Sequence, residues 1–180
     1  MKLIVWLWNP WQQYKATRHN IWVTMLERFL DCEKIWELKY DNKRKAEILT
    51  MDQFWEKVIF CAPQTYMNLS WESVWPLAQF YKIPAENILV IHDEIDFVVW
   101  RIAMKKWWSA AWHNWLKNMI SKLWTKDFWR IRIWIGRPAN QNMVADYVLS
   151  TFKKNEKELL DEKFEEISEF ILKFLKDNEG

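Results

Sequence analysis

The stretch Ile88-Leu89-Val90-Ile91-His92-Asp93-Glu94 decides the fold class of this chain. Its four aliphatic residues predict a short strand that is buried on both faces, because none of them suits a solvated face. The residues at 2–8 and 58–61 form similar apolar runs, and residues 101–105 and 130–135 are two further strand candidates. Strands of this kind favour a sheet that is covered by helices.

Helical spacing of apolar residues occurs between these strands, at residues 21–30, 70–81 and 114–123. The alternation predicts a single α/β domain over residues 1–180. A last amphipathic helix, at about residues 156–176, carries an apolar stripe made of Leu160, Phe164, Ile167, Ile171 and Phe174. We expect this stripe to dock on the domain, although a partner-binding or coiled-coil helix remains an alternative.

Composition narrows the class of protein. Half of the residues (51%) are hydrophobic and 28% are charged, which argues against disorder. We find no signal peptide and no apolar run as long as the roughly 18 residues that suggest a membrane span, so we expect a cytoplasmic chain with no membrane partner. Cys32 and Cys61 are too few for a disulfide framework, and the Cys and His spacings fit no zinc site.

The net charge of +2 hides a strong asymmetry. Between Lys105 and Arg137, eight basic residues accompany a single acidic one, Asp127. This block is either a patch that faces phosphate groups or an ordinary solvated face.

Polar residues gather next to the predicted strands, where open α/β sheets usually hold their sites. His19 precedes a predicted helix and could act as a general base, and a carboxylate such as Asp93 could fix its tautomer. Asparagines at strand–helix junctions could polarise an ester and hold a backbone amide. The alternatives remain open: His19 could be a cap or core residue, and Asn20, Asn68 and Asn114 could be helix N-cap or turn residues. Chemistry alone indicates a possible hydrolase site on a basic α/β domain.

Longer strings are more specific. In chain order these strings are residues 1–5 with Asn9-Pro10, Tyr14 and Thr17-Arg18-His19-Asn20, then 63–70, 90–96, 105–117 and 130–138. Together they resemble the successive motifs of bacterial peptidyl-tRNA hydrolases over about residues 1–149.

The resemblance implies a monomeric α/β enzyme with a twisted mixed β-sheet packed between α-helices. The enzyme would cleave the ester that joins a peptide to the terminal ribose of tRNA, without a metal or an organic cofactor. By motif, His19 would be the general base and Asp93 its partner. The substrate groove would be formed by Asn9, Tyr14, Met67, Asn68, His113 and Asn114. Lys105 and Arg132 would hold a tRNA phosphate, which agrees with the basic block.

Sixteen tryptophans and two glycines set this chain apart. Where the family pattern has or commonly has glycine, this chain carries Trp6, Trp8, Trp11, Trp22, Trp71, Trp100, Trp107, Trp108, Trp112, Trp115, Trp124 and Trp134. A left-handed backbone forced on a non-glycine residue costs about 1–2 kcal/mol, and overpacking costs about 1–3 kcal/mol. Two alternatives to an active enzyme therefore stand: an RNA-binding α/β module with impaired catalysis, or a chain without a unique native fold.

Overall fold

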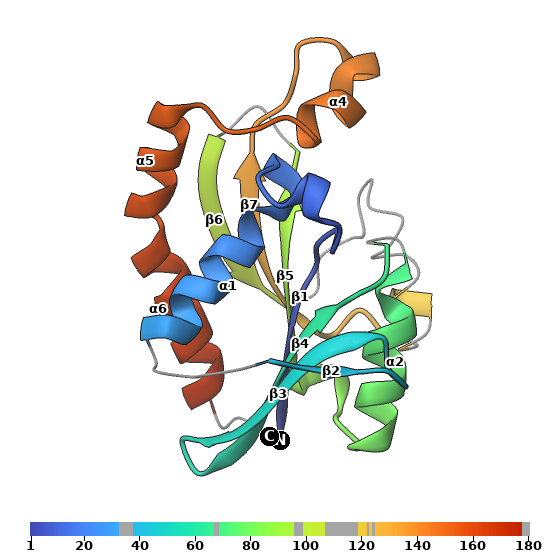
Figure 1. Cartoon of the computed structure of the whole chain (residues 1–180). Helices are drawn as coiled ribbons and strands as arrows, with labels where there is room; N and C mark the ends of the chain where they lie inside the picture. The colour runs from blue at the N-terminus through green and yellow to red at the C-terminus, as the bar shows by residue number, and fades with distance from the viewer. Residues whose placement is uncertain are drawn as a thin grey trace.

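A computed structural model describes residues 1–32, 38–66, 69–95, 99–106, 119–121, 123 and 125–177. In this part of the chain seven strands form one sheet (Figure 1), with bounds β1 Lys2–Trp6, β2 Lys39–Asp41, β3 Ala46–Gln53, β4 Glu56–Pro63, β5 Ile88–Glu94, β6 Val99–Lys105 and β7 Trp129–Ile135. The helices are α1 Ile21–Cys32, α2 Trp71–Phe80, α4 Val144–Val148, α5 Lys154–Glu162 and α6 Phe164–Lys176. Short 3-10 turns are η1 Gln12–Tyr14, η2 Arg18–Asn20, η4 Ala85–Asn87 and η5 Gln141–Met143.

The sheet is mixed, with strand order β2-β3-β4-β1-β5-β7-β6. Its four central strands, β4, β1, β5 and β7, are parallel, and antiparallel strands complete both edges. All five predicted strands are confirmed, with small differences at their ends. Neither β2 nor β3 is predicted from the sequence. These strands lie outside the parallel centre and are only partly buried, so they lack the continuous apolar runs that mark the central strands.

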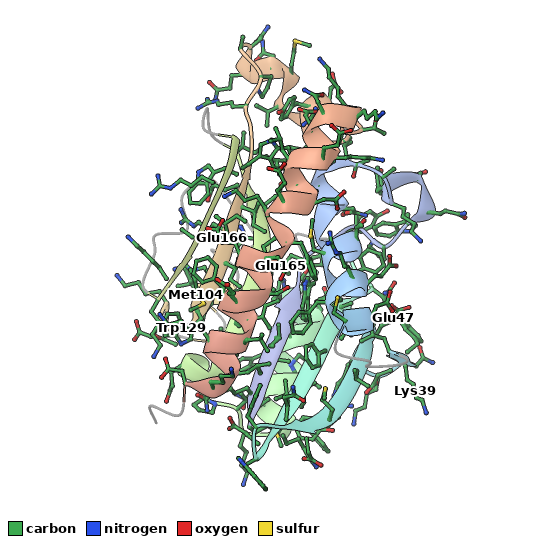
Figure 2. The ribbon with its side chains drawn as sticks, turned by 90° about the vertical axis from the view of Figure 1, so that its left-hand side faces the viewer. Lys39, Glu47, Met104, Trp129, Glu165 and Glu166 are labelled. Carbon is green, nitrogen blue, oxygen red and sulfur yellow. The ribbon has the colours of Figure 1, made fainter. Side chains whose placement is uncertain are left out.

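Helices cover both faces of the sheet. Helices α1, α5 and α6 pack on one face, which we call the α1 face, and α2 packs on the other, the α2 face (Figures 1 and 2). Because side chains alternate along a strand, Leu89 and Ile91 of β5 point into the α1 face and Ile88 and Val90 into the α2 face. The predicted helices at 21–30 and 70–81 are thus confirmed as α1 and α2, whereas most of the one at 114–123 lies outside the described residues.

The C-terminal segment forms two helices where we predicted one. Helix α5 ends at Glu162, Lys163 lies in a turn, and α6 begins at Phe164. All five residues of the predicted stripe are nevertheless buried in the core of the α1 face, as docking requires.

The first strand and the last helix are joined directly. Lys2 is 3% exposed, and its ammonium group donates hydrogen bonds to the carbonyl oxygens of Phe174 (2.6 Å) and Leu175 (3.1 Å). A cation at a helix C-terminus satisfies carbonyls that have no partner within the helix and is favoured by the helix dipole.

The tryptophans strain the backbone less than expected. Among the described residues only two tryptophans have a positive φ, Trp55 (66°) and Trp100 (63°), and of these only Trp100 belongs to the twelve glycine-like positions. Trp6 lies in regular strand and stacks on Phe60, with ring centroids 5.6 Å apart. At Trp6 the bulky side chain is therefore accommodated by packing rather than by a left-handed backbone.

Candidate active site

The predicted catalytic pair is brought together by the fold. His19 lies in η2, directly before α1, and Asp93 is the penultimate residue of β5. His19 Nδ1 lies 2.8 Å from Asp93 Oδ2 although the residues are 74 positions apart. Asp93 is on the α1 face, because it alternates in phase with Leu89 and Ile91. The helix that follows His19 therefore packs on the same face of the sheet as the carboxylate that it needs.

The two side chains of this pair differ in their exposure to solvent. The Asp93 side chain is 0% exposed, whereas that of His19 retains 17% exposure. A carboxylate accepts, so Nδ1 donates its hydrogen to Asp93, and the neutral ring then carries its free lone pair on Nε2. Burial alone would lower the pKa of His19, but the charge and hydrogen bond of Asp93 outweigh it and raise that pKa. The result is a base with a fixed tautomer.

Two hydrogen bonds from Asn20, which the sequence does not predict, form a clamp on the backbone of Asn9. Its backbone N–H donates to Asn20 Oδ1 at 2.9 Å, and Asn20 Nδ2 donates to the Asn9 carbonyl oxygen at 2.6 Å. Asn20 is 0% exposed. Asn20 lies in the turn η2, and both groups of its amide engage the loop after β1, a role that neither alternative for Asn20, helix N-cap or turn residue, includes. The backbone of Asn9 is thereby held beside the residue that follows His19.

The other side of the His19 segment is anchored by Arg18. Its guanidinium group contacts Glu156 Oε2 at 2.7 Å and Ser150 Oγ at 3.1 Å, and it lies over the Tyr147 and Phe152 rings. Arg18 is 4% exposed, and its backbone N–H donates to the Ser150 carbonyl oxygen. The position of His19 therefore depends on the segment between α4 and α5, a link that no local sequence signal could reveal.

The predicted substrate-binding residues are only partly described. Tyr14 lies in η1, half-buried, with its ring edge-on to Trp11, which itself packs against Tyr66 at 4.0 Å between centroids. The remaining four predicted positions, Met67, Asn68, His113 and Asn114, lie outside the described residues.

The two predicted phosphate-binding residues lie on the opposite face of the sheet from Asp93. Arg132 is in phase with Arg130 on β7, and Lys105 at the end of β6 is paired with Arg130, so all three belong to the α2 face. Lys105 is exposed, as a phosphate contact requires. Arg132 instead is 8% exposed and forms an ion pair with Glu94 at 3.3 Å. Its contact with phosphate stays a prediction.

Arg130 adds positive charge to this face. It is 0% exposed, and burial together with the charge of Arg132 lowers its pKa to about 10, although Glu94 acts in the opposite direction. Within the basic block counted in the sequence, Arg130 and Arg132 are therefore buried, whereas Lys105, Lys126 and Arg137 are exposed.

Comparison with known proteins gives the family. A family model described as peptidyl-tRNA hydrolase matches residues 3–179. The chain belongs to this family. It is 45% identical to the peptidyl-tRNA hydrolase of Bdellovibrio bacteriovorus over 87% of this chain and 83% of the relative, and 39% identical to that of Shouchella clausii over 95% and 91%. The crystal structure of the Acinetobacter baumannii peptidyl-tRNA hydrolase superposes with a TM-score of 0.84 at 32% identity, covering 94% of this chain and 85% of the other.

Family membership selects among the expectations. The mixed α/β fold predicted from the resemblance is confirmed, and neither the RNA-binding module with impaired catalysis nor the chain without a unique fold is favoured. That tryptophan replaces glycine at twelve family positions stays a prediction. In the described part of the chain, no helix is long and apolar enough to span a membrane, and no group of three or more metal-binding side chains comes together.

Proposed function

We propose that this chain hydrolyses peptidyl-tRNA with His19 as general base and Asp93 as its partner. The observation that carries the assignment of roles is the 2.8 Å contact between His19 Nδ1 and the buried Asp93 carboxylate. With Nδ1 committed to Asp93, Nε2 is the nitrogen that accepts a proton from water.

The reaction then runs in two proton transfers. Nε2 takes one hydrogen of a water molecule while the water oxygen attacks the carbonyl carbon of the ester. Asp93 remains ionised and stabilises the imidazolium that forms. As the tetrahedral intermediate collapses, the ribose oxygen leaves and receives the proton from Nε2. The products are the free peptide and tRNA.

The remaining roles follow from the family motifs. Asn9 would position the peptide or the ester, and its fixed backbone supports this role because misplacement by about 1 Å can reduce a rate 100-fold. Asn68 and Asn114 would position the ester and the water, and Tyr14, Met67 and His113 would line the groove. Lys105 and Arg132 would hold a tRNA phosphate. We further propose a cytoplasmic monomer that needs no metal or organic cofactor.

The test is ester hydrolysis by the purified chain. An N-acetylaminoacyl-tRNA, labelled in the amino acid, is incubated with the wild-type chain and with His19→Ala, and the loss of acid-precipitable label is followed. Turnover by the wild-type chain that His19→Ala abolishes supports the assignment. Full activity of His19→Ala would overturn the role of His19, and salt-sensitive tRNA binding without any turnover would overturn the hydrolase function itself.

A further inference from the structure

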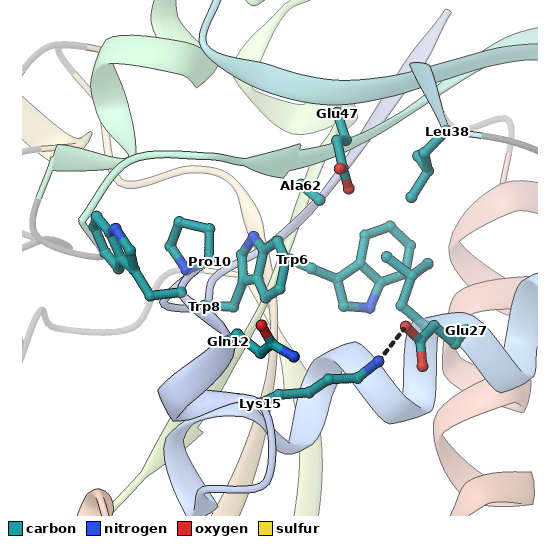
Figure 3. Close-up of a pocket in the computed structure, with 11 residues that line it drawn as sticks. Trp6, Trp8, Pro10, Gln12, Lys15, Glu27, Leu38, Glu47 and Ala62 are labelled. Atoms are coloured by element: carbon teal, nitrogen blue, oxygen red, sulfur yellow. Dashed lines mark ion pairs between the residues drawn. The ribbon is translucent and has the colours of Figure 1, made fainter. Parts of the chain in front are cut away.

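A cavity lies beside the loop after β1, apart from the catalytic pair. It measures about 380 Å³, and neither His19 nor Asp93 lines it. Figure 3 shows Trp6 and Trp8 side by side in its wall, with Pro10 beyond Trp8. A volume of this size is within the usual range for a bound small group, about 300–1,000 Å³.

Two carboxylates enter this apolar cavity. Glu47 projects into it from β3, and Glu27 borders it from α1 (Figure 3). Lys15 lies 3.9 Å from Glu27, with both side chains more than half exposed. Glu47 is partly buried and its carboxylate has neither a hydrogen bond nor an ion pair with any described residue. The titratable groups that line the cavity therefore carry a net charge of −1.

The surroundings of Glu47 disfavour its charged form. Burial raises the pKa of Glu47, and the charge of Glu27 raises it further. A cation placed between them would relieve both effects, since it would restore the favourable surroundings that the Glu47 carboxylate lost on leaving water.

The aromatic wall suits an organic cation rather than a metal ion. Indole faces attract guanidinium and ammonium groups, and they also cover the aliphatic stem that carries such a group. A metal ion would require several oxygen or nitrogen ligands.

We propose that the cavity binds the basic side chain of a peptide, with its guanidinium or ammonium group between Glu47 and Glu27 and its aliphatic stem against the indoles of Trp6 and Trp8. Arginine and lysine side chains combine the two features that this arrangement requires, a cation and an aliphatic stem. The binding stands independently of the hydrolase reaction. Only the assignment of this cavity as a subsite for the substrate's own peptide rests on the proposed function.

The direct test is calorimetric titration of the purified chain with N-acetyl-arginine N-methylamide. The matched ligand is N-acetyl-citrulline N-methylamide, which has nearly the same shape without the charge. We expect the arginine ligand to bind at least about tenfold more tightly, as one charge-assisted hydrogen bond requires. Equal affinity of the two ligands, or no binding of either, would overturn the proposal.

Four variants locate the binding. Glu47→Gln should remove most of the preference for arginine, and Lys15→Gln should increase it. Trp8→Ala removes part of the wall that covers the aliphatic stem, so it should weaken the binding of both ligands. The matched control is Glu86→Gln, which should change nothing. Glu86 is an exposed carboxylate in η4, directly before β5. An arginine preference that survives in Glu47→Gln would contradict the site.

A kinetic arm identifies the source of the peptide. Hydrolysis of N-acetyl-arginyl-tRNA is compared with that of N-acetyl-citrullyl-tRNA, by the wild-type chain and by Glu47→Gln. A higher kcat/KM for the arginine substrate that Glu47→Gln removes makes the cavity a subsite for the substrate peptide. Equal kcat/KM values together with calorimetric binding assign it to a separate peptide. Absence of all hydrolysis would refute the proposed function and leave the calorimetric result to decide this inference.

Discussion

Replacing Asp93 with Asn tests the central pair most sharply. The change preserves the size of the side chain but removes its charge, and its amide can donate to Nδ1 of His19, which places the hydrogen of the neutral ring on Nε2. The base would then lack its lone pair on the side that faces the water. A hydrogen bond to a charged group contributes about 1.5–3 kcal/mol, which is roughly 10- to 150-fold in rate.

Loss of the correct tautomer adds to this effect. The corresponding change in a Ser-His-Asp triad lowers kcat about 10⁴-fold, so we expect Asp93→Asn to lower kcat by about 10²–10⁴-fold. The pH profile should also change. Activity requires neutral His19, and Asp93 raises its pKa, so the acid limb of the wild-type profile should lie above that of an ordinary histidine and should move to lower pH in the variant.

The assay is kcat against pH for ester hydrolysis, with Asp161→Asn as the control. Asp161 is an exposed carboxylate whose ion-pair partner is Arg28, at 3.1 Å, and not His19, so its loss should leave the profile unchanged. If Asp93→Asn retains the wild-type kcat and the same acid limb, the assigned role of Asp93 is wrong.

Stability should respond to pH through the same pair. The pKa of His19 is higher in the folded chain than in the unfolded chain. The pair therefore adds stability that is fully present below the unfolded-state pKa and is lost as pH rises through the folded-state pKa. Urea unfolding of the wild type and of Asp93→Asn across this pH range would measure this contribution. Asn20→Ala should lower the free energy of unfolding by about 1–3 kcal/mol in the same measurement, and should also lower kcat/KM, because it removes both hydrogen bonds between Asn20 and the partly buried backbone of Asn9. Trp55→Gly should raise the melting temperature by about 2–4 °C, since Trp55 has a φ of 66° and a fully exposed side chain with no burial to lose; an unchanged melt would refute left-handed strain there. Lys105→Gln should reduce the slope of log tRNA affinity against log salt by about 1, and an unchanged slope would show that Lys105 makes no phosphate contact.

The elements that were best predicted from the sequence are the strands made of short apolar runs. Residues 88–91 are buried on both faces and therefore have no polar positions to confuse the pattern. Strand β3 has the opposite character: its burial is partial, and its hairpin with β4 turns at Phe54 and Trp55, which carry none of the usual signs of a tight turn. Such a strand is defined by its neighbours, which a local pattern does not contain.

The site divides in the same way. His19 and Asp93 could be selected because their chemistry and motifs are local, even though their contact is not. The Asn20 clamp depends on two loops meeting, and the Arg18 anchor spans 138 positions to Glu156. The ion pair of Arg132 with Glu94 likewise arises only when β5 and β7 are placed side by side. Pairings of this kind follow from the assembled sheet and not from spacing in the sequence.

The buried ammonium group of Lys2 has a consequence for how the molecule opens. Its acceptors lie 172 and 173 positions along the chain, and its desolvation lowers its pKa even though Glu56 and Asp177 counteract this. If α6 lifted from the sheet, Lys2 would lose these acceptors at the edge of the core. Detachment of the last helix is thus coupled to disruption of the first, central strand. The backbone amides of β1 and α6 should therefore exchange their hydrogens with solvent together, because the two elements open as one cooperative unit.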